Sequence, residues 1–294
     1  MKSSGSLRKI LEAGEFIVAP GCFDALSALI AQDIGFPAVA ISGYAFGARS
    51  GVTEPRLTMS EMVDITFEIT RSVGVPVVVD AGAGFGDPLH VVRTVRELEA
   101  AGAAACHIED QLFPKRAHYH RNYQEQTIPA DEMVGKIEHA CAARSSDEFL
   151  IIARTDAMKT DGFDEGIRRA NLYRAAGADM VMSFPNSLAE AQAAPELCSA
   201  PLIYLNSSGN RVGRPVLSAG DARSMGYKML YEAISPVLGA YIGVRRILEE
   251  LHGLGAVQRF EDEGRAVRLD VERVVGLEEY YRIEEETVER FRPR

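Results

Sequence analysis

The chain has 294 residues and is 47% hydrophobic and 25% charged, a composition that excludes wholesale disorder, collagen and a disulfide scaffold. Its formal net charge of −10, with no run of basic residues, removes the electrostatic driving force for binding nucleic acid or an anionic membrane surface. The length suits either two domains of about 150 residues or one (β/α)8 barrel of roughly 250 residues with a surplus.

The N-terminal segment MKSSGSLRKILEAGEF has one short apolar stretch that charged residues interrupt, which is unlike a signal peptide or a membrane anchor. No later segment reaches the roughly 18 uninterrupted apolar residues of a membrane span. We therefore expect a cytoplasmic protein that binds no membrane and no nucleic acid. The cysteines form no C-x-x-C pair and are interpreted as small apolar residues in a reducing compartment; they are Cys22, Cys106, Cys141 and Cys198.

Short, continuously apolar runs recur along the chain, and each is followed by a candidate helix. Such runs are too short for a helix and are typical of buried parallel strands. In chain order they are FIVAP near residue 18, AVAIS at 38–42, PVVVD at 76–80, AACHIE at 104–109, FLIIARTDA near 152, DMVMS at 179–183, PLIYL at 201–205 and KMLYE at 228–232.

A glycine stands between a helical stretch and the next strand in five of these units. At that place a helix C-terminus favours a residue with left-handed backbone conformation. The five are Gly35, Gly74, Gly102, Gly177 and Gly226.

Eight strand–helix units in about 240 residues predict a closed (β/α)8 barrel of the TIM type over residues 1–255. A Rossmann-like open sheet is the alternative, but GAGFG at 82–86 matches only part of a G-x-G-x-x-G fingerprint, because Asp87 stands where the last glycine would be. Residues 256–294 are charged with an aromatic and aliphatic stripe and are predicted to form a C-terminal helical extension. We expect this extension to pack on a neighbouring subunit, with packing on its own barrel as the alternative.

In a barrel of this kind, the residues that act lie at the C-terminal ends of the strands. Asp80 and Glu109 end neighbouring strands and suit one shared Mg²⁺, with Mn²⁺ as an alternative, while the guanidinium of Arg154 suits a substrate carboxylate. Helix capping, or structural pairing with Arg154, is the alternative role for each acid. The other polar residues predicted at this rim are Ser42, Gly43, Tyr44, Asp110, Thr155, Asp156 and Asn206.

The segment 110–133 separates the fourth strand from its helix by some twenty residues, longer than βα loops usually run, which is typical of a lid. Its basic and proton-transferring side chains predict a cationic lid over an anionic substrate, and a solvated loop without a role is the alternative. These side chains are Lys115, Arg116, His118, Tyr119 and His120. The remaining histidines fall in predicted helices or a strand and are interpreted as structural; they are His90, His107, His139 and His252.

Several segments in order resemble the isocitrate lyase and phosphoenolpyruvate mutase superfamily, especially its short members such as methylisocitrate lyase and carboxyphosphonoenolpyruvate phosphonomutase. The resemblance spans roughly residues 8–290 and implies an (α/β)8 barrel whose last helix is swapped between subunits, usually in a dimer of dimers. It also implies a Mg²⁺-bound 2-oxo or 2-hydroxy acid and the cleavage or formation of a C–C or P–C bond. The segments are GCFDALSALIAQDIGFPAVAISGY, VVVDAGAGFGDP, HIEDQLFPKR, IIARTDA and AGAD.

The resemblance also implies roles for individual residues. Asp80 matches the principal metal ligand, Glu109 a glutamate of the metal shell, and Arg154 the arginine that holds the substrate. Glu54 is a looser match to an acidic residue on a mobile loop and is carried over as a third metal-site acid. The remaining matches are Ser42 and Gly43, whose backbone N–H groups would bind the substrate carboxylate, Tyr44 beside them, and Lys115 and Arg116 at the start of the gating loop.

Three departures from the family pattern bear on the reaction. Gly82 replaces the second aspartate of D-x-D-x-G-[YF]-G, which removes one anion near the metal. Ala117 replaces the lyase cysteine, so another acid must protonate the product, and the neighbouring segment offers His118, Tyr119 and His120. The glutamate of the family's Asn-x-x-Glu-Gly signature is missing after Asn206, which is left as a substrate contact.

Together these features predict a Mg²⁺-dependent lyase that cleaves a C–C bond of a small anionic 2-hydroxy or 2-oxo carboxylic acid, assembled as a homotetramer. Phosphonate P–C bond chemistry, by a mutase or a hydrolase, is the alternative within the enzymes. A non-catalytic barrel that binds a carboxylate is the alternative outside them.

Overall fold

The computed structural model describes residues 6–116 and 127–291. The chain divides into two compact units, residues 1–237 and residues 238–294.

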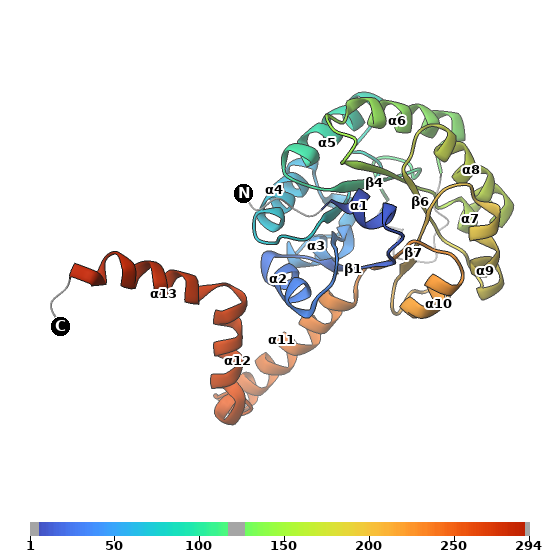
Figure 1. Cartoon of the computed structure of the whole chain (residues 1–294). Coiled ribbons are helices and arrows are strands. Elements are labelled where there is room, and N and C mark those ends of the chain that lie inside the picture. Colours follow the sequence, from blue (N-terminus) through green and yellow to red (C-terminus); the bar gives the residue numbers. More distant parts are fainter. Residues whose placement is uncertain (1–5, 117–126, 292–294) are drawn as a thin grey trace. The chain divides into compact units, whose positions relative to one another are not determined.

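The first unit is a closed barrel of parallel strands that follow one another in chain order, with β8 pairing back onto β1 (Figure 1). This confirms the predicted TIM-type barrel and excludes the open Rossmann-like sheet. The strands are β1 (Ile17–Cys22), β2 (Val39–Ile41), β3 (Val77–Asp80), β4 (Ala105–Glu109), β5 (Leu150–Arg154), β6 (Met180–Ser183), β7 (Leu202–Asn206) and β8 (Met229–Glu232).

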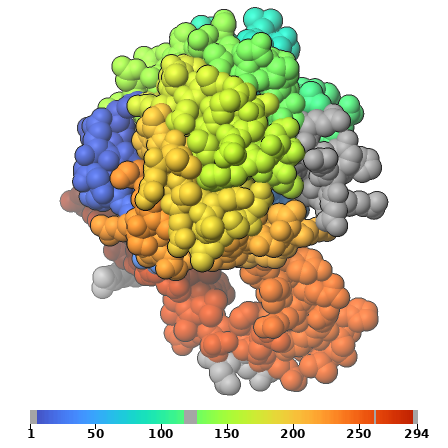
Figure 2. Space-filling model, turned by 90° about the vertical axis from the view of Figure 1, so that its right-hand side faces the viewer, coloured from blue at the N-terminus to red at the C-terminus, as the bar shows by residue number. Residues whose placement is uncertain are grey.

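Helices surround the strands, and from the side of α8 and α9 they hide the barrel from view (Figure 2). The helices of this unit are α1 (Leu7–Glu12), α2 (Ala25–Ile34), α3 (Gly43–Arg49), the 3-10 turn η1 (Glu54–Arg56), α4 (Met59–Thr70), α5 (Pro88–Ala100), α6 (Ala130–Ala143), α7 (Ala157–Thr160), α8 (Phe163–Ala175), α9 (Leu188–Leu197) and α10 (Ala219–Ser224).

The predicted left-handed glycine between a helix and the next strand is confirmed at four positions. Gly35, Gly102, Gly177 and Gly226 have φ between 90° and 110°, the left-handed region that side chains with a Cβ rarely adopt. Gly74 is the exception, because it has no positive φ and its amide donates to Gln32 Oε1 at 2.5 Å. The prediction of a left-handed residue was therefore wrong at Gly74.

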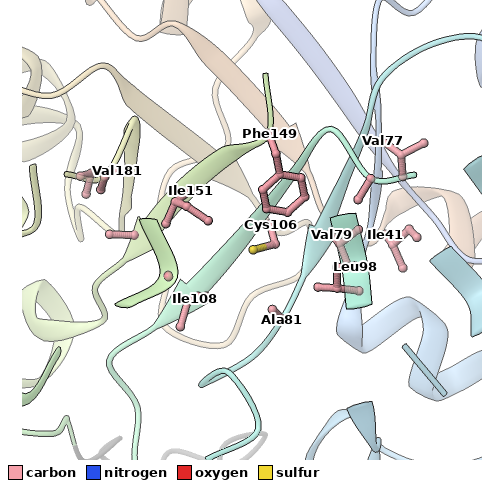
Figure 3. Packing of buried hydrophobic residues seen from close by; sticks show 14 of the residues in the cluster. Ile41, Val77, Val79, Ala81, Leu98, Cys106, Ile108, Phe149, Ile151 and Val181 are labelled. Carbon is pink, nitrogen blue, oxygen red and sulfur yellow. The ribbon is translucent and has the colours of Figure 1, made fainter. Parts of the chain in front are cut away.

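Strand alternation divides the core into an inner and an outer cluster. Inward-facing residues such as Ile152 and Met182 fill the barrel. Outward-facing residues such as Val79, Cys106 and Ile151 pack between the strands and the helices (Figure 3). Two faces buried in this way explain why the strands read as continuous apolar runs rather than as alternating patterns.

Helix α1 covers the N-terminal end of the barrel, where Leu7 is fully buried as part of the inner cluster. Its N-cap, Ser6, accepts a hydrogen bond from the amide of Lys9. The N-terminal end is therefore closed, and the polar side chains of the barrel interior gather at the opposite end.

The second unit begins within α11 (Ser235–Leu254), and the extension predicted over residues 256–294 is helical in its described part. It continues with α12 (Phe260–Val274), α13 (Leu277–Glu286) and the turn η3 (Glu289–Phe291). Many of its apolar side chains are exposed, including Tyr241, Leu254 and Tyr280 at 60% or more. Among the described residues, no helix has the length and apolar character needed to cross a membrane.

Candidate active site

The C-terminal ends of β3, β4 and β5 carry three ionisable side chains that face the barrel interior. Asp80 is 7% exposed, Arg154 is 4% exposed and Glu109 is fully buried. Each is the last residue of its strand, and Glu109 pairs in register with Arg154. The two acids and the arginine that the sequence placed at one rim therefore share one layer of the barrel.

Glu109 lies between two cations. Its Oε2 is 3.2 Å from Nη1 of Arg154, and its Oε1 is 3.1 Å from Nζ of Lys115. Lys115 also forms an ion pair with Glu54. The start of the predicted lid and the acidic loop after β2 thus reach the strand ends, although Glu54 lies 61 positions before Lys115 in the chain.

Asp80 is held in place by backbone amides. The amide of Gly43 donates to its Oδ2 at 3.2 Å, and the amide of Gly82 donates to its Oδ1 at 3.0 Å. A Cβ on Gly43 would lie 2.9 Å from Oδ2 of Asp80 and 3.0 Å from Cγ of Glu54, so only glycine allows this approach. The close approach explains a glycine directly after Ser42.

The pKa of Asp80 is lowered to about 2. Burial acts in the opposite direction and is the largest influence, but neighbouring positive groups and the Gly82 amide outweigh it. Because burial lowers the pKa of His107, that ring is neutral at pH 7, and the lasting positive charge comes from Lys115 and Arg154. Asp80 is therefore ionised at neutral pH.

His107 was interpreted from the sequence as structural, and such a histidine would be expected to have its ring hydrogen-bonded; the structure shows it buried without these hydrogen bonds from the described residues. Its ring is 1% exposed, and neither ring nitrogen has a hydrogen-bond partner among the described residues. Nδ1 lies 3.6 Å from Oδ1 of Asp80, and the ring meets Tyr231 edge-on with centroids 5.9 Å apart. The sequence signal was the spacing: His107 is two residues before Glu109, so the pleat puts both side chains inside the barrel.

Burial raises the pKa of Glu109 to about 7, although Lys115 and Arg154 both act to lower it. When Glu109 loses this proton, the site gains a second negative charge beside that of Asp80. Glu109 and Asp80 thus differ strongly in acidity, a pattern typical of functional sites.

This difference predicts a pH-dependent affinity for Mg²⁺, because a carboxylate ligand must be deprotonated. Affinity is expected to rise about tenfold per pH unit below 7 and to level off above it, as measured by titration calorimetry with MgCl₂. Glu109→Gln should remove the slope, whereas Glu97→Gln, at a partly exposed side chain on α5, should keep it. A pH-independent affinity in the wild type would contradict the assignment.

Folding stability provides a second readout of the same group. The pKa of Glu109 is raised above its ordinary value of 4.5, so the folded state holds a proton that the unfolded state releases. The contribution of Glu109 to stability therefore falls as the pH rises from about 4.5 to about 7. Glu109→Gln is expected to melt a few degrees higher than the wild type at pH 8.

Asp156 orients Arg154. Its Oδ2 accepts from Nε of Arg154 at 3.2 Å and from Nε2 of Gln111 at 3.0 Å. Its own amide donates to Asp110 Oδ1 at 3.0 Å. Asp110 is fully buried and accepts further hydrogen bonds from Thr155, Tyr173 and Arg169. Gln111 was missed in the sequence because its partner lies 45 positions further along the chain.

The other predicted site residues are placed less closely around the acids. Ser42 is buried and caps α3, accepting from the Ala45 amide at 3.4 Å, while Tyr44 is 39% exposed. Both polar atoms of the Asn206 side chain bond the backbone of Leu217, so its role as a substrate contact stays a prediction. Arg116 is exposed, and the remaining lid residues His118, Tyr119 and His120 lie outside the described part of the chain.

The described residues contain no group of three or more His, Cys, Asp and Glu side chains arranged to hold a metal ion. Mg²⁺ needs only one or two carboxylates, since it keeps waters and takes substrate oxygens. Both carboxylate oxygens of Glu109 are buried without a hydrogen bond from the described residues and are held by ion pairs with Lys115 and Arg154, and Asp80 supplies an ionised oxygen donor on the neighbouring strand. The residues present therefore fit a hard cation that is held by few protein ligands. Gly82 supplies no further carboxylate.

A closed α/β barrel with buried acids and cations at the C-terminal ends of its strands has the architecture of a barrel enzyme. The family model of phosphoenolpyruvate phosphomutase matches residues 7–252, and the chain belongs to this family.

Individual relatives agree with this membership. 2-Methylisocitrate lyase of Aeropyrum pernix is 35% identical over 276 residues, covering 93% of this chain and 87% of the relative. 2,3-Dimethylmalate lyase of Eubacterium barkeri is 34% identical over 253 residues, covering 85% of each chain. The solved structure of phosphonopyruvate hydrolase in complex with oxalate and Mg²⁺ has a TM-score of 0.85 at 26% identity, covering 98% of this chain and 100% of that one.

The resemblance noted in the sequence is thus confirmed. The chain is an enzyme of the isocitrate lyase and phosphoenolpyruvate mutase superfamily, and its named relatives include carbon–carbon lyases. The alternative of a non-catalytic barrel is not retained.

Proposed function

We propose that this enzyme is a Mg²⁺-dependent lyase that cleaves the C2–C3 bond of a small 2-hydroxy or 2-oxo carboxylic acid. The observation that carries the proposal is the layer formed by ionised Asp80, by Glu109 and by Arg154 at the mouth of the barrel. This layer combines oxygen donors for a hard cation with a guanidinium that suits a carboxylate. Relatives whose names are 2-methylisocitrate lyase and 2,3-dimethylmalate lyase support the same class of substrate.

Asp80 and Glu109 would hold the cation, with Glu54 as a further acid once it is released from Lys115. When bound, Mg²⁺ would supply Lewis-acid stabilisation of the negative charge that develops on the substrate oxygens. Mn²⁺ suits the same oxygen donors.

The residues of the chain have separate tasks in this proposal. Arg154, held by Asp156 and next to Glu109, binds the C1 carboxylate and stabilises the charge that the substrate develops as its bond breaks. Lys115 joins the lid to the buried acids and adds a positive charge at the mouth. The backbone amides of Ser42 and Gly43 would bind the C1 carboxylate once the Gly43 amide exchanges its hydrogen bond to Asp80 for the substrate. Tyr44 follows them in the chain.

In a 2-hydroxy acid, a proton must leave the C2 hydroxyl as the C2–C3 bond breaks, and another must reach the enolate product. A 2-oxo acid must first add water at C2, and the hydroxyl formed in this way then loses its proton in the same step. With Ala117 in the place of the lyase cysteine, we assign these transfers to the lid residues His118, Tyr119 and His120. Imidazole titrates near neutral pH and is suited to both directions of transfer.

The lid assignment predicts that His118→Ala or His120→Ala lowers turnover by about 100- to 10,000-fold while ligand affinity changes little. Turnover is measured with the cleaved substrate, and affinity by calorimetry with oxalate in the presence of Mg²⁺. His139→Ala, on the exposed face of α6, serves as the control and should behave like the wild type. Full turnover in both lid variants would exclude these histidines as the acid and the base.

The reaction itself is tested with two panels of compounds and purified protein in Mg²⁺. Release of pyruvate or glyoxylate from 2-hydroxy acids is the expected result. Release of phosphate from phosphonopyruvate would instead favour P–C bond chemistry, which the family model and the phosphonopyruvate hydrolase structure keep as the second candidate.

We also propose that the protein acts in the cytoplasm as a homotetramer, a dimer of dimers. Residues 1–255 would form the barrel, and the exposed apolar side chains of the extension 256–294 would pack on a neighbouring subunit. Light scattering coupled to size-exclusion chromatography tests the assembly, and a monomer would contradict it.

A further inference from the structure

Arg214 lies in the segment between β7 and α10 and reaches the inner mouth of the barrel. The residue is 6% exposed, and its Nη2 donates to the carbonyl oxygen of Leu205 at 2.6 Å. Its guanidinium carbon is 4.7 Å from the centroid of the Phe184 ring. Because Leu205 and Phe184 both belong to the inner cluster, the charge of Arg214 is directed to the interior end of the site rather than to the outer surface.

The same aromatic ring contacts the arginine of the site. The guanidinium carbon of Arg154 is also 4.7 Å from the centroid of Phe184. Both distances fall within the range of cation–π interactions. Phe184 thus positions two guanidinium groups in one compact cluster.

Hydrogen bonds hold the segment that carries Arg214. The side chain of Asn210 accepts from the amide of Arg214 at 2.9 Å and donates to its carbonyl oxygen at 3.0 Å. The side chain of Asn206 binds the amide and the carbonyl oxygen of Leu217 at 3.0 and 2.8 Å, and the hydroxyl of Tyr204 donates to the carbonyl oxygen of Pro215. The position of Arg214 is therefore set before any ligand arrives, which lowers the entropic cost of binding.

The barrel topology puts this cluster opposite the acids. Asp80 ends β3 and Arg214 follows β7, and in a closed barrel of eight strands in chain order these strands face each other. Asp80 and Glu109 thus lie on the β3–β4 side of the mouth, and the guanidinium groups of Arg154 and Arg214 lie on the β5–β7 side, where Arg154 is also paired with Asp156. A guanidinium matches the planar geometry of a carboxylate and stays charged at every physiological pH.

We infer that Arg214 is a specificity-determining residue that binds the distal carboxylate of a dicarboxylic substrate. The inference rests on the proposed function, which places C1 and C2 of the substrate beside Asp80 and Glu109. A chain extending from that end across the mouth meets Arg214. A monocarboxylic acid of the same framework has no group to place there.

Malate and lactate test this role, since they share the 2-hydroxy acid framework and differ in the distal carboxylate. Calorimetry in Mg²⁺ is expected to show that the wild type binds malate about 10- to 100-fold more tightly than lactate. In Arg214→Gln, malate affinity should fall to the level of lactate while lactate affinity is retained, which also shows that the variant is folded. Arg214→Lys should keep part of the malate preference, and the exposed Arg223→Gln on α10 should keep all of it.

Three results would overturn the assignment: no preference for malate in the wild type, unchanged malate affinity in Arg214→Gln, or an equal loss for both acids in that variant. Turnover is measured separately. A wild type that prefers malate through Arg214 but cleaves no 2-hydroxy or 2-oxo acid would contradict the proposed function and leave the binding role standing. An active enzyme whose malate affinity is the same in the wild type and in Arg214→Gln would contradict the binding role of Arg214 and leave the proposed function standing.

Discussion

Asp80→Asn is expected to reduce turnover on the order of a thousandfold or more and to abolish the heat of Mg²⁺ binding. Asparagine keeps the shape of the side chain but removes the negative charge, and Gly82 brings no second carboxylate to compensate. The charge on Asp80 is present at neutral pH, since the pKa is lowered to about 2. Turnover with the cleaved substrate and calorimetry with MgCl₂ measure the two effects.

Asp87→Asn is a matched control for this substitution, because Asp87 follows in the same loop but is exposed and caps α5. Asparagine is as good an N-cap as aspartate, so the helix should keep its stability. Unchanged Mg²⁺ binding in Asp80→Asn, with the control also unchanged, would show that the cation binds elsewhere.

The barrel could be predicted from the sequence because its cause is local and repeated. Each unit contains a buried strand, a helix and, at Gly35, Gly102, Gly177 and Gly226, a residue whose left-handed conformation ends the helix. Gly74 fits the same letter pattern without the conformation, because Ser72 and Val73 separate it from Arg71, the C-cap of α4, whereas Gly102, Gly177 and Gly226 directly follow the C-caps of their helices. A periodic pattern thus identifies the elements, while the geometry of each turn depends on its own contacts.

The acids and Arg154 could be predicted because each ends a strand, and the ends of parallel strands in a barrel share one rim. No such rule predicts contacts between segments that lie far apart in the sequence. The pairing of Lys115 with Glu54 and the stacking of Arg214 on Phe184 join loops whose conformations no spacing specifies. His107 is an intermediate case, because strand alternation places it inside the barrel but its missing hydrogen bonds appear only in the folded chain.

Arg154 joins the chemistry of the site to its stability. It lies between Glu109 and Asp156, both buried, so its removal leaves two acids without their common cation. Breaking a buried ion pair from one side costs about 3–5 kcal/mol, and a variant that loses the charge is expected to melt well below the wild type. A variant that keeps the charge separates the two roles.

Arg154→Lys is therefore expected to stay folded and to lose about 100-fold or more in kcat/KM, mainly through a higher KM. Lysine preserves the positive charge beside Glu109 but lacks the planar fork that binds a carboxylate through two parallel hydrogen bonds and the flat surface that stacks on Phe184. Thermal melting and steady-state kinetics measure the two effects, and the exposed Arg168→Lys on α8, which pairs with Glu165, is the control. Wild-type kcat/KM in Arg154→Lys would show that only charge matters at this position, whereas an equal loss in the control would point to a general effect of the substitution.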